Sequence, residues 1–317
     1  MKLKNRPIGF KKHAFGFITG LFRTLFIIGV CYLFIFPFLS MLINAFKPIE
    51  VATDPTAVWI PRGFSLAGIK GAAKEMKYGK SALLTLTFTL GGTVGSLVSC
   101  SLAGYGLARF RFPGKSVTLV LVILTIIVPP QVTYTSTYLL YRFFDFGGLL
   151  SLFGVSLNLL DTPWVFILPS IFASGLRNGI FILVFYSLFK GLPIEMEEAA
   201  KIDGCDVFKT FVKVMLPLAV PAFVTVMLFS IVWHWTDFQS TTIFFTDNAV
   251  KPLIVMLSKL QYNLAASGVI ESVGSNYQAV NIFLQAGALL VVAPPVILYI
   301  FMQKHFTESI ERTGLVG

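Results

Sequence analysis

The feature that most constrains this chain is a series of long apolar segments separated by short charged ones. The first such segment covers residues 24–46, the second 81–107 and the last 279–303. About 20 apolar residues in a helix cross the hydrocarbon core of a bilayer. A helix also satisfies its own backbone hydrogen bonds, which lipid cannot do. The composition agrees, because only 13% of the residues are charged, against about 25% in soluble domains. The pattern therefore predicts an all-α, polytopic membrane protein.

We expect six transmembrane helices, with a membrane domain over residues 24–303 between tails at 1–23 and 304–317. The expected spans are residues 24–46, 81–107, 116–140, 165–190, 218–238 and 279–303, with outer loops at 47–80, 141–164 and 239–277. Proline interrupts helical hydrogen bonding. Pro37 is therefore expected to kink the first span, and the pairs Pro129-Pro130 and Pro294-Pro295 to break the third and the last.

The distribution of charge predicts the orientation of the chain. Of 25 Lys and Arg residues, 15 lie in the expected inner segments, nine in the outer ones, and Arg177 in neither. This excess predicts that both termini of a multi-pass membrane protein lie in the cytoplasm. The net charge of +10 does not indicate nucleic-acid binding, because the cations are dispersed between apolar segments. The first apolar run is too long for the core of a signal peptide.

No residue pattern indicates catalysis or metal binding. The three cysteines show neither pairing nor metal-ligand spacing, and His234 has no metal-ligand partner on its helix. Gly79-Lys80-Ser81 ends like a phosphate-binding loop, but Lys74 stands where that loop requires glycine. We therefore expect a chain that is not an enzyme and holds no cofactor, so that any ATP hydrolysis is supplied by other chains.

The segment between the fourth and fifth spans, residues 192–217, carries charge at regular spacing. Pro193 suits the first turn of a helix, and Gly204 can end that helix in the left-handed conformation. Asp206 is placed to cap a second helix. The segment therefore predicts two short helices with a sharp turn between them. A solvated loop of mixed charge is the alternative reading.

Four polar residues near the spans are candidates for a translocation pathway: Gln131, Arg177, Asn178 and Asp237. Arg177 lies 13 residues before Lys190, or about 20 Å at the helical rise of 1.5 Å per residue. An arginine within the membrane usually faces a cavity or a partner. Alternatively, Arg177 pairs with a carboxylate or extends to the interface. Two other features have a purely structural interpretation. Pro129-Pro130 can be a kink in the helix, and Trp233 and Trp235 can form an aromatic belt at the membrane interface.

The order of residues after the fourth span resembles the EAA loop of ABC importer permeases. The matching positions are Glu198-Ala199-Ala200, Asp203-Gly204, Phe211, Leu216-Pro217 and Pro221. In that family the loop is a cytoplasmic coupling helix that docks on an ATPase subunit. The resemblance implies that Glu198 and Asp203 stabilise the turn and the ATPase contact, that Ala199 and Ala200 allow close approach, and that Gly204 permits the bend.

The resemblance extends over nearly the whole chain. The segment AGYGLARFRFPGK, then Pro129-Pro130-Gln131, Trp233-x-Trp235-x-Asp237 and Pro294-Pro295 occur in order. Together they are similar to the smaller permease subunit of carbohydrate ABC importers of the maltose/oligosaccharide type. That family implies a second homologous permease, two ATPase subunits that hold ATP and Mg²⁺, and an extracytoplasmic solute-binding protein. It also implies import of a sugar or oligosaccharide by alternating access.

Two other functions remain possible on the sequence. One is an ABC importer permease for another solute, such as amino acids or phosphate. The other is an ion-coupled carrier that works without ATPases. Such a carrier would need paired carboxylates or a His/Asp relay within the spans, which hold almost no acidic residues apart from Asp237 at an edge.

Overall fold

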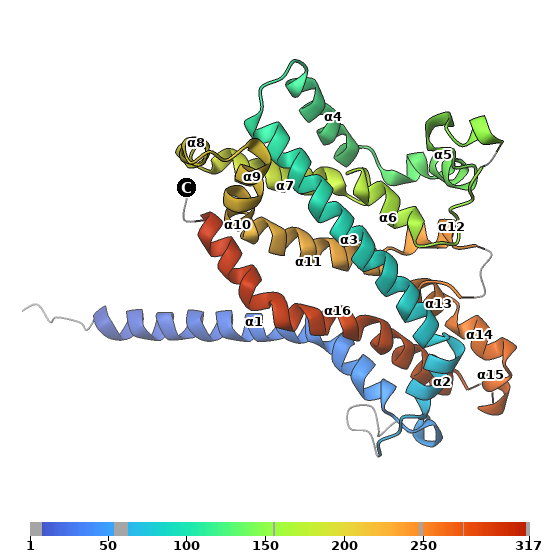
Figure 1. Cartoon of the computed structure of the whole chain (residues 1–317). Helices are drawn as coiled ribbons and strands as arrows, with labels where there is room; N and C mark the ends of the chain where they lie inside the picture. The colour runs from blue at the N-terminus through green and yellow to red at the C-terminus, as the bar shows by residue number, and fades with distance from the viewer. Residues whose placement is uncertain (1–7, 54–62, 155, 247–249, 275, 315–317) are drawn as a thin grey trace, which may run out of the picture. The chain divides into compact units, whose positions relative to one another are not determined.

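The structure is a computed structural model that describes residues 8–314, except 54–62, 155, 247–249 and 275 (Figure 1). Within those residues the chain is helical, and its only β-type pairing is a bridge between Phe144 and Leu157. The all-α prediction is therefore confirmed. The α-helices are α1 (Ile8–Ala45), α2 (Ala67–Glu75), α3 (Tyr78–Arg109), α4 (Lys115–Ile127), α5 (Pro130–Arg142), α6 (Trp164–Ile171), α7 (Asn178–Gly191), α8 (Glu195–Ile202), α9 (Val207–Thr210), α10 (Leu216–Leu218), α11 (Val220–Thr236), α12 (Phe238–Phe244), α13 (Leu253–Ser258), α14 (Leu260–Ala266), α15 (Val269–Ser272) and α16 (Tyr277–Gly314). Short 3-10 turns lie at η1 (Ile49–Val51), η2 (Phe146–Gly148) and η3 (Ser151–Phe153), and a π-helical turn at η4 (Phe211–Met215).

Three stretches are long and apolar enough to cross a membrane as single helices: Gly16–Ala45, Tyr78–Arg109 and Tyr277–Lys304. Three bent helix pairs also qualify, namely α4 with α5, α7 with α8, and Val207–Leu218 with α11. The described residues thus hold three spans, or up to six if each bent pair is one span. The six expected from the sequence are the upper end of this range.

The chain forms two compact units. The first comprises Met1–Ala72 and Leu264–Leu289, and the second comprises Ala73–Asn263 and Leu290–Gly317. Within the first unit, α2 lies directly on α16. A Cβ atom on Gly68 would lie 2.8 Å from Cγ2 of Ile282, and one on Gly71 would lie 2.5 Å from Cε1 of Phe283. Glycine therefore permits the close approach of these two helices.

In the second unit, α3 packs against α6, α7 and α11 (Figure 1). Its contact face includes many small residues, which let helices pack closely. A Cβ atom on Gly95 would lie 3.1 Å from the backbone nitrogen of Ile171, and one on Gly104 would lie 2.9 Å from that of Tyr186. The Ser99 hydroxyl donates a hydrogen bond to the carbonyl of Ser170 at 2.6 Å. The neighbouring backbones thus lie too close to α3 for larger side chains.

The break expected at Pro129-Pro130 is present, because α4 and α5 meet there at 99°. The fourth span differs from its expected form as one helix over residues 165–190. It consists of α6 and α7, separated by a turn in which Ala173 and Arg177 have φ values of +55° and +56°. A helix cannot continue through left-handed residues. The continuous helix expected from the apolar run was therefore wrong.

The expected break at Pro294-Pro295 is also wrong, because both prolines lie inside α16. A proline leaves the carbonyl four residues before it without a helical partner. Those carbonyls belong to Leu290 and Val291. The Tyr78 hydroxyl donates to the first at 3.1 Å, and the indole Nε1 of Trp235 donates to the second at 2.9 Å. Side chains from α3 and α11 thus replace the hydrogen bonds that the prolines cannot make.

The boundaries of the other segments also differ from expectation. The outer segment 47–80 contains η1, α2 and the start of α3, and the segment 239–277 contains most of α12 and all of α13–α15. The tail at 304–317 continues α16 to Gly314, and the tail at 1–23 is helical from Ile8. After segment 192–217 the chain bends by 76° at Ala219. The reason is that Pro221 cannot donate to the carbonyl four residues earlier.

Candidate functional site

The helix-turn-helix expected between the fourth and fifth spans is present in α8 and α9. Gly204 follows α8 with a φ of +79°. Its N–H bonds to the carbonyl of Lys201 at 3.0 Å, and the N–H of Cys205 bonds to that of Ala200 at 2.9 Å. These two bonds form a Schellman motif, which ends a helix sharply. A residue with a side chain resists this conformation, so the sharp turn depends on glycine.

Asp206 caps the second helix as the sequence indicates. Its Oδ1 accepts a hydrogen bond from the backbone N–H of Lys209 at 2.7 Å. This bond satisfies one of the amides at the start of α9 that lack a helical partner. The local chemistry of Gly204 and Asp206 thus determines the course of the chain from α8 to α9.

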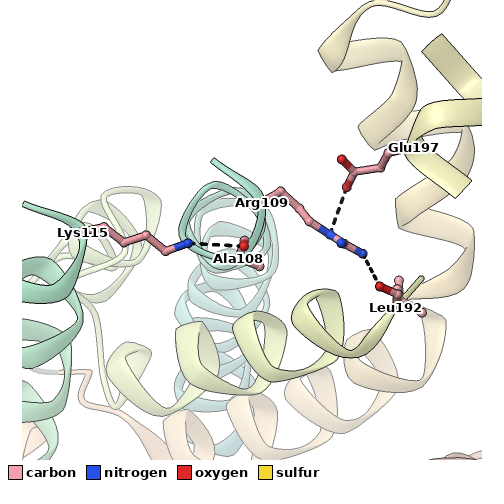
Figure 2. Close-up of polar contacts among 5 residues, drawn as sticks. All are labelled: Ala108, Arg109, Lys115, Leu192 and Glu197. Carbon is pink, nitrogen blue, oxygen red and sulfur yellow. Dashed lines mark hydrogen bonds and ion pairs between the residues drawn. The ribbon is translucent and has the colours of Figure 1, made fainter. Parts of the chain in front are cut away.

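A buried ion pair attaches α8 to the end of α3 (Figure 2). Nε of Arg109 lies 3.0 Å from Oε1 of Glu197, and each side chain is only 9% exposed. Arg109 also donates from Nη2 to the carbonyl of Leu192 at 2.7 Å. The arginine therefore contacts both α8 and the segment that follows α7. Tyr105 adds a hydrogen-bonding neighbour to Glu197.

The end of α3 is itself stabilised. Lys115 directs its ammonium group to the carbonyls of Ala108 at 3.4 Å and Phe110 at 3.2 Å (Figure 2). A cation at the carboxyl end of a helix interacts favourably with its unpaired carbonyls. The sequence analysis included Arg109 and Lys115 only in the count of basic residues of the inner segments, and the pairing of Arg109 with Glu197 was missed. Glu197 lies three residues before the buried Ala200, a spacing that places both on one helix face.

The residues of the EAA-like signature include buried and exposed side chains, and Leu216 and Pro221 are half-buried. Ala200 and Phe211 are buried. The exposed members are Glu198, Ala199, Asp203, Gly204 and Pro217. Phe211 packs on Tyr105, with ring centroids 5.0 Å apart. Signature residues thus both anchor the loop and form its surface.

The surface of the loop also carries large apolar side chains. Ile202 is 86% exposed and Phe208 is 68% exposed, and Ile194 and Val207 are exposed beside them. A cluster of exposed apolar residues on a charged, solvated loop marks an interaction surface. We call these four residues and the exposed signature residues the loop surface.

Of the four pathway candidates, Gln131 lies in a polar cluster between α5 and α12, and Asp237 lies at the start of α12. Gln131 Nε2 donates to Oε1 of Gln239 at 2.8 Å, and the Tyr134 hydroxyl lies 3.4 Å from the same oxygen. Asp237 caps α12 by accepting from the N–H of Ser240 at 3.2 Å. The sequence analysis did not identify Tyr134 or Gln239. Their pairing depends on the contact between α5 and α12, which sequence spacing does not reveal.

Asn178 lies in the packed interior rather than on a surface. It is 1% exposed, and its Oδ1 accepts a hydrogen bond from the Ser96 hydroxyl of α3 at 2.8 Å. The Sγ of Cys100 lies 3.7 Å from its backbone carbonyl. Asn178 therefore links α7 to α3.

Arg177, in contrast, is exposed. Its guanidinium carbon lies 4.6 Å from the ring centroid of Trp233, within the range of cation–π attraction. Trp235 is buried and donates its hydrogen bond to α16. The interfacial-belt interpretation therefore does not hold for Trp235, whereas Trp233 is half-buried. His234, between them, is also buried, with Nδ1 2.8 Å from the carbonyl of Ser230.

Comparisons with known proteins agree with this arrangement. Residues 95–312 match the family described as "Binding-protein-dependent transport system inner membrane component". The chain is 29% identical over 279 residues to the polygalacturonan/rhamnogalacturonan transport system permease protein YtcP of Bacillus subtilis, covering 87% of this chain and 90% of that protein. It is 28% identical over 304 residues to the arabinooligosaccharides transport system permease protein AraQ of the same organism, covering 93% and 95%.

The fold has a counterpart among solved structures. One chain in the crystal structure of a bacterial ABC transporter involved in the import of the acidic polysaccharide alginate superposes with a TM-score of 0.74. The match covers 96% of this chain and 100% of that one, at 20% sequence identity. The family match includes the second half of α3 from Gly95, the whole segment 192–217 and nearly all of α16. The chain therefore belongs to the family of inner membrane components of binding-protein-dependent transport systems.

Proposed function

We propose that this chain is the permease subunit of an ATP-driven importer of sugars or oligosaccharides. The observation that carries the proposal is the exposed α8–Gly204–α9 turn, which the Arg109–Glu197 pair attaches to a long apolar helix. Such a turn offers a rigid docking surface whose displacement reaches the membrane helices. The names of YtcP and AraQ, both permeases for sugar polymers or oligosaccharides, support carbohydrate as the solute.

In this proposal the loop surface docks on one of two ATPase subunits in the cytoplasm, and those subunits hold ATP and Mg²⁺. When the ATPases close, they push α8. Arg109 contacts both Glu197 and the carbonyl of Leu192, so it passes the push to α3 and to the end of α7. A second, homologous permease subunit completes the pathway. Both termini lie in the cytoplasm, and an extracytoplasmic binding protein delivers the sugar.

The proposed pathway includes the polar cluster at Gln131, Tyr134 and Gln239, together with Asp237. Amide and hydroxyl groups can both donate and accept hydrogen bonds, which suits the hydroxyl groups of a sugar. The bend between α4 and α5 places Gln131 at the start of α5, where a helix has unpaired amides. Alternating access would expose this cluster first to the binding protein and then to the cytoplasm.

The docking part is tested by purifying the tagged chain from its native membranes in mild detergent. We expect the wild-type chain to bring an ATPase subunit and a second permease. Ile202→Glu places a charge at a site that is 86% exposed, so it should release the ATPase and keep the second permease. Tyr262→Glu, on a residue of α14 that is 75% exposed, is the matched control and should keep both.

The transport part is tested in proteoliposomes with the co-purified subunits and the binding protein. Uptake of labelled oligosaccharide should require ATP and should stop with Ile202→Glu. Purification of a stable wild-type chain without any ATPase would contradict the importer proposal. ATP-dependent uptake of an amino acid or phosphate, with no uptake of any sugar, would keep the coupling role and reject carbohydrate as the solute.

A further inference from the structure

We propose that Arg177 binds the carboxylate of an acidic sugar, so that the transported carbohydrate contains uronate units; the inference depends on the proposed import function. It concerns the one pathway candidate that carries a positive charge.

The backbone and an aromatic stack hold Arg177 in place. It occupies the turn between α6 and α7 with a φ of +56°. Its guanidinium lies 4.6 Å from the centroid of Trp233, whose ring also stacks at 5.3 Å on Phe181 and on Phe229. A guanidinium that rests on an aromatic ring keeps the N–H groups at its edge available. That planar edge matches a carboxylate, which it can bind through two parallel hydrogen bonds.

Arg177 has no acidic partner in the part of the chain that the structure describes. Other basic side chains do pair with carboxylates, as Arg109 does with Glu197 and Lys209 with Asp206. A cation over Trp233 is attracted to the ring but is not neutralised by it. The positive charge of Arg177 is therefore available to an anion from outside this chain.

The position of Arg177 makes an unneutralised charge costly. It directly precedes α7, whose 14 residues correspond to about 21 Å at the helical rise. If the end of α7 next to the coupling loop lies at the cytoplasmic surface, Arg177 lies within the bilayer or near its outer face. A charge there has to face water or an anion rather than lipid. Amide and hydroxyl groups are sufficient to bind a neutral sugar, which needs no cation. The carboxylate of a uronate, in contrast, would pair with the positive charge of Arg177.

A second group of cations leads to the same ligand. Lys74, Lys77 and Lys80 are exposed around the start of α3, in the segment that the proposed topology places outside. Lysines there oppose the general preference for basic residues inside. Basic residues on the outer side raise the local concentration of an anionic solute. The chain thus carries positive charge in this outer segment and again at Arg177.

The test uses the assembled transporter in proteoliposomes with its binding protein. The probes are labelled trimers of galacturonate, glucuronate and mannuronate, each paired with the same trimer after reduction of its carboxyl groups to alcohols. The wild-type transporter should import at least one acidic trimer in preference to its neutral counterpart. Arg177→Gln should lower uptake of that acidic trimer roughly tenfold or more, because a charge-assisted hydrogen bond is lost. Uptake of the neutral trimer should change little.

Two variants separate charge from geometry. Arg177→Lys keeps the charge and loses the planar edge, so it should retain part of the uptake. Lys190→Gln is the matched control, because Lys190 stacks on Tyr186 at 5.5 Å at the other end of α7. That control should keep the preference for the acidic trimer.

Several outcomes would overturn the inference. One is that the wild type imports none of the acidic trimers, or imports the neutral ones equally well. Another is that Arg177→Gln lowers the uptake of both members of a pair equally. Loss of the second permease on purification of Arg177→Gln would assign the carboxylate to that subunit instead. ATP-dependent import of neutral sugars without a preference for acidic ones would reject this inference and leave the proposed function intact.

Discussion

Arg109 and Glu197 form a buried ion pair, with Nε and Oε1 3.0 Å apart, that joins the end of α3 to α8. The two residues are far apart in sequence and lie on separate helices. Arg109 also binds the carbonyl of Leu192, so one side chain fixes both the start of segment 192–217 and its first helix. Movement of α8 relative to α3 would require this pair to break.

We expect Glu197→Gln to destabilise the protein strongly, because it leaves the Arg109 charge buried without its partner. Removal of one member of a buried pair typically costs about 3–5 kcal/mol. Thermal unfolding in detergent would measure the loss. Glu198→Gln, at the exposed neighbouring position, is the control and should change stability by less than about 0.5 kcal/mol. Equal effects of the two variants would contradict the importance of the pair.

The apolar double variant Arg109→Met with Glu197→Leu separates stability from coupling. Apolar replacement of a buried pair is often neutral or stabilising, so this protein should unfold near the wild-type temperature. ATP hydrolysis by the assembled transporter should nevertheless become less dependent on loaded binding protein. Normal stimulation in the double variant would show that the pair serves stability alone.

Gly204→Ala should disrupt the turn between α8 and α9. An alanine at a φ of +79° is strained by about 1–2 kcal/mol. The variant should therefore retain less ATPase on co-purification than the wild type. Gly191→Ala is the control, because nothing lies within 4 Å of the added Cβ and its φ is not positive. Undiminished ATPase binding by Gly204→Ala would mean that docking does not need the tight turn.

Gly104→Ala should separate α3 from α7. Its Cβ would lie 2.9 Å from the backbone nitrogen of Tyr186 and 3.1 Å from the carbonyl oxygen of Ile182, and backbone atoms cannot rotate away. Overpacking of this kind costs about 1–3 kcal/mol, which a melting curve would detect. Gly79→Ala, on the same helix with open space around it, should be neutral or slightly stabilising. The prediction fails if both variants melt alike.

Trp235→Phe should weaken α16 at its two prolines. The change keeps an aromatic ring but removes the N–H that satisfies the carbonyl of Val291. A buried carbonyl without a partner costs about 1–3 kcal/mol. We expect faster hydrogen exchange in α16 near Pro295, measured by mass spectrometry. Trp233→Phe, which removes no such bond, is the comparison, and equal exchange in both variants would argue against this function of Trp235.

Local chemistry made several features predictable from the sequence. The apolar runs and the small number of charges determine that the chain forms membrane helices, because lipid offers the backbone no hydrogen bonds. The turn after α8 follows from Gly204 and Asp206 alone, since each acts on the backbone within a few residues of itself. The bend at Pro129-Pro130 is likewise a local effect of the proline ring.

Tertiary structure decided the features that depend on distant neighbours. Pro294-Pro295 has the same local chemistry as Pro129-Pro130, yet α16 continues because Tyr78 and Trp235 supply the missing hydrogen bonds. Glu197 and Glu198 are adjacent and alike in sequence, but only Glu197 is buried. The end of α3 covers one side of α8, and a single sequence does not specify which side. Sequence alone determined the helices and turns that residues form with their near neighbours, whereas packing between helices decided which charges are buried and which prolines interrupt a helix.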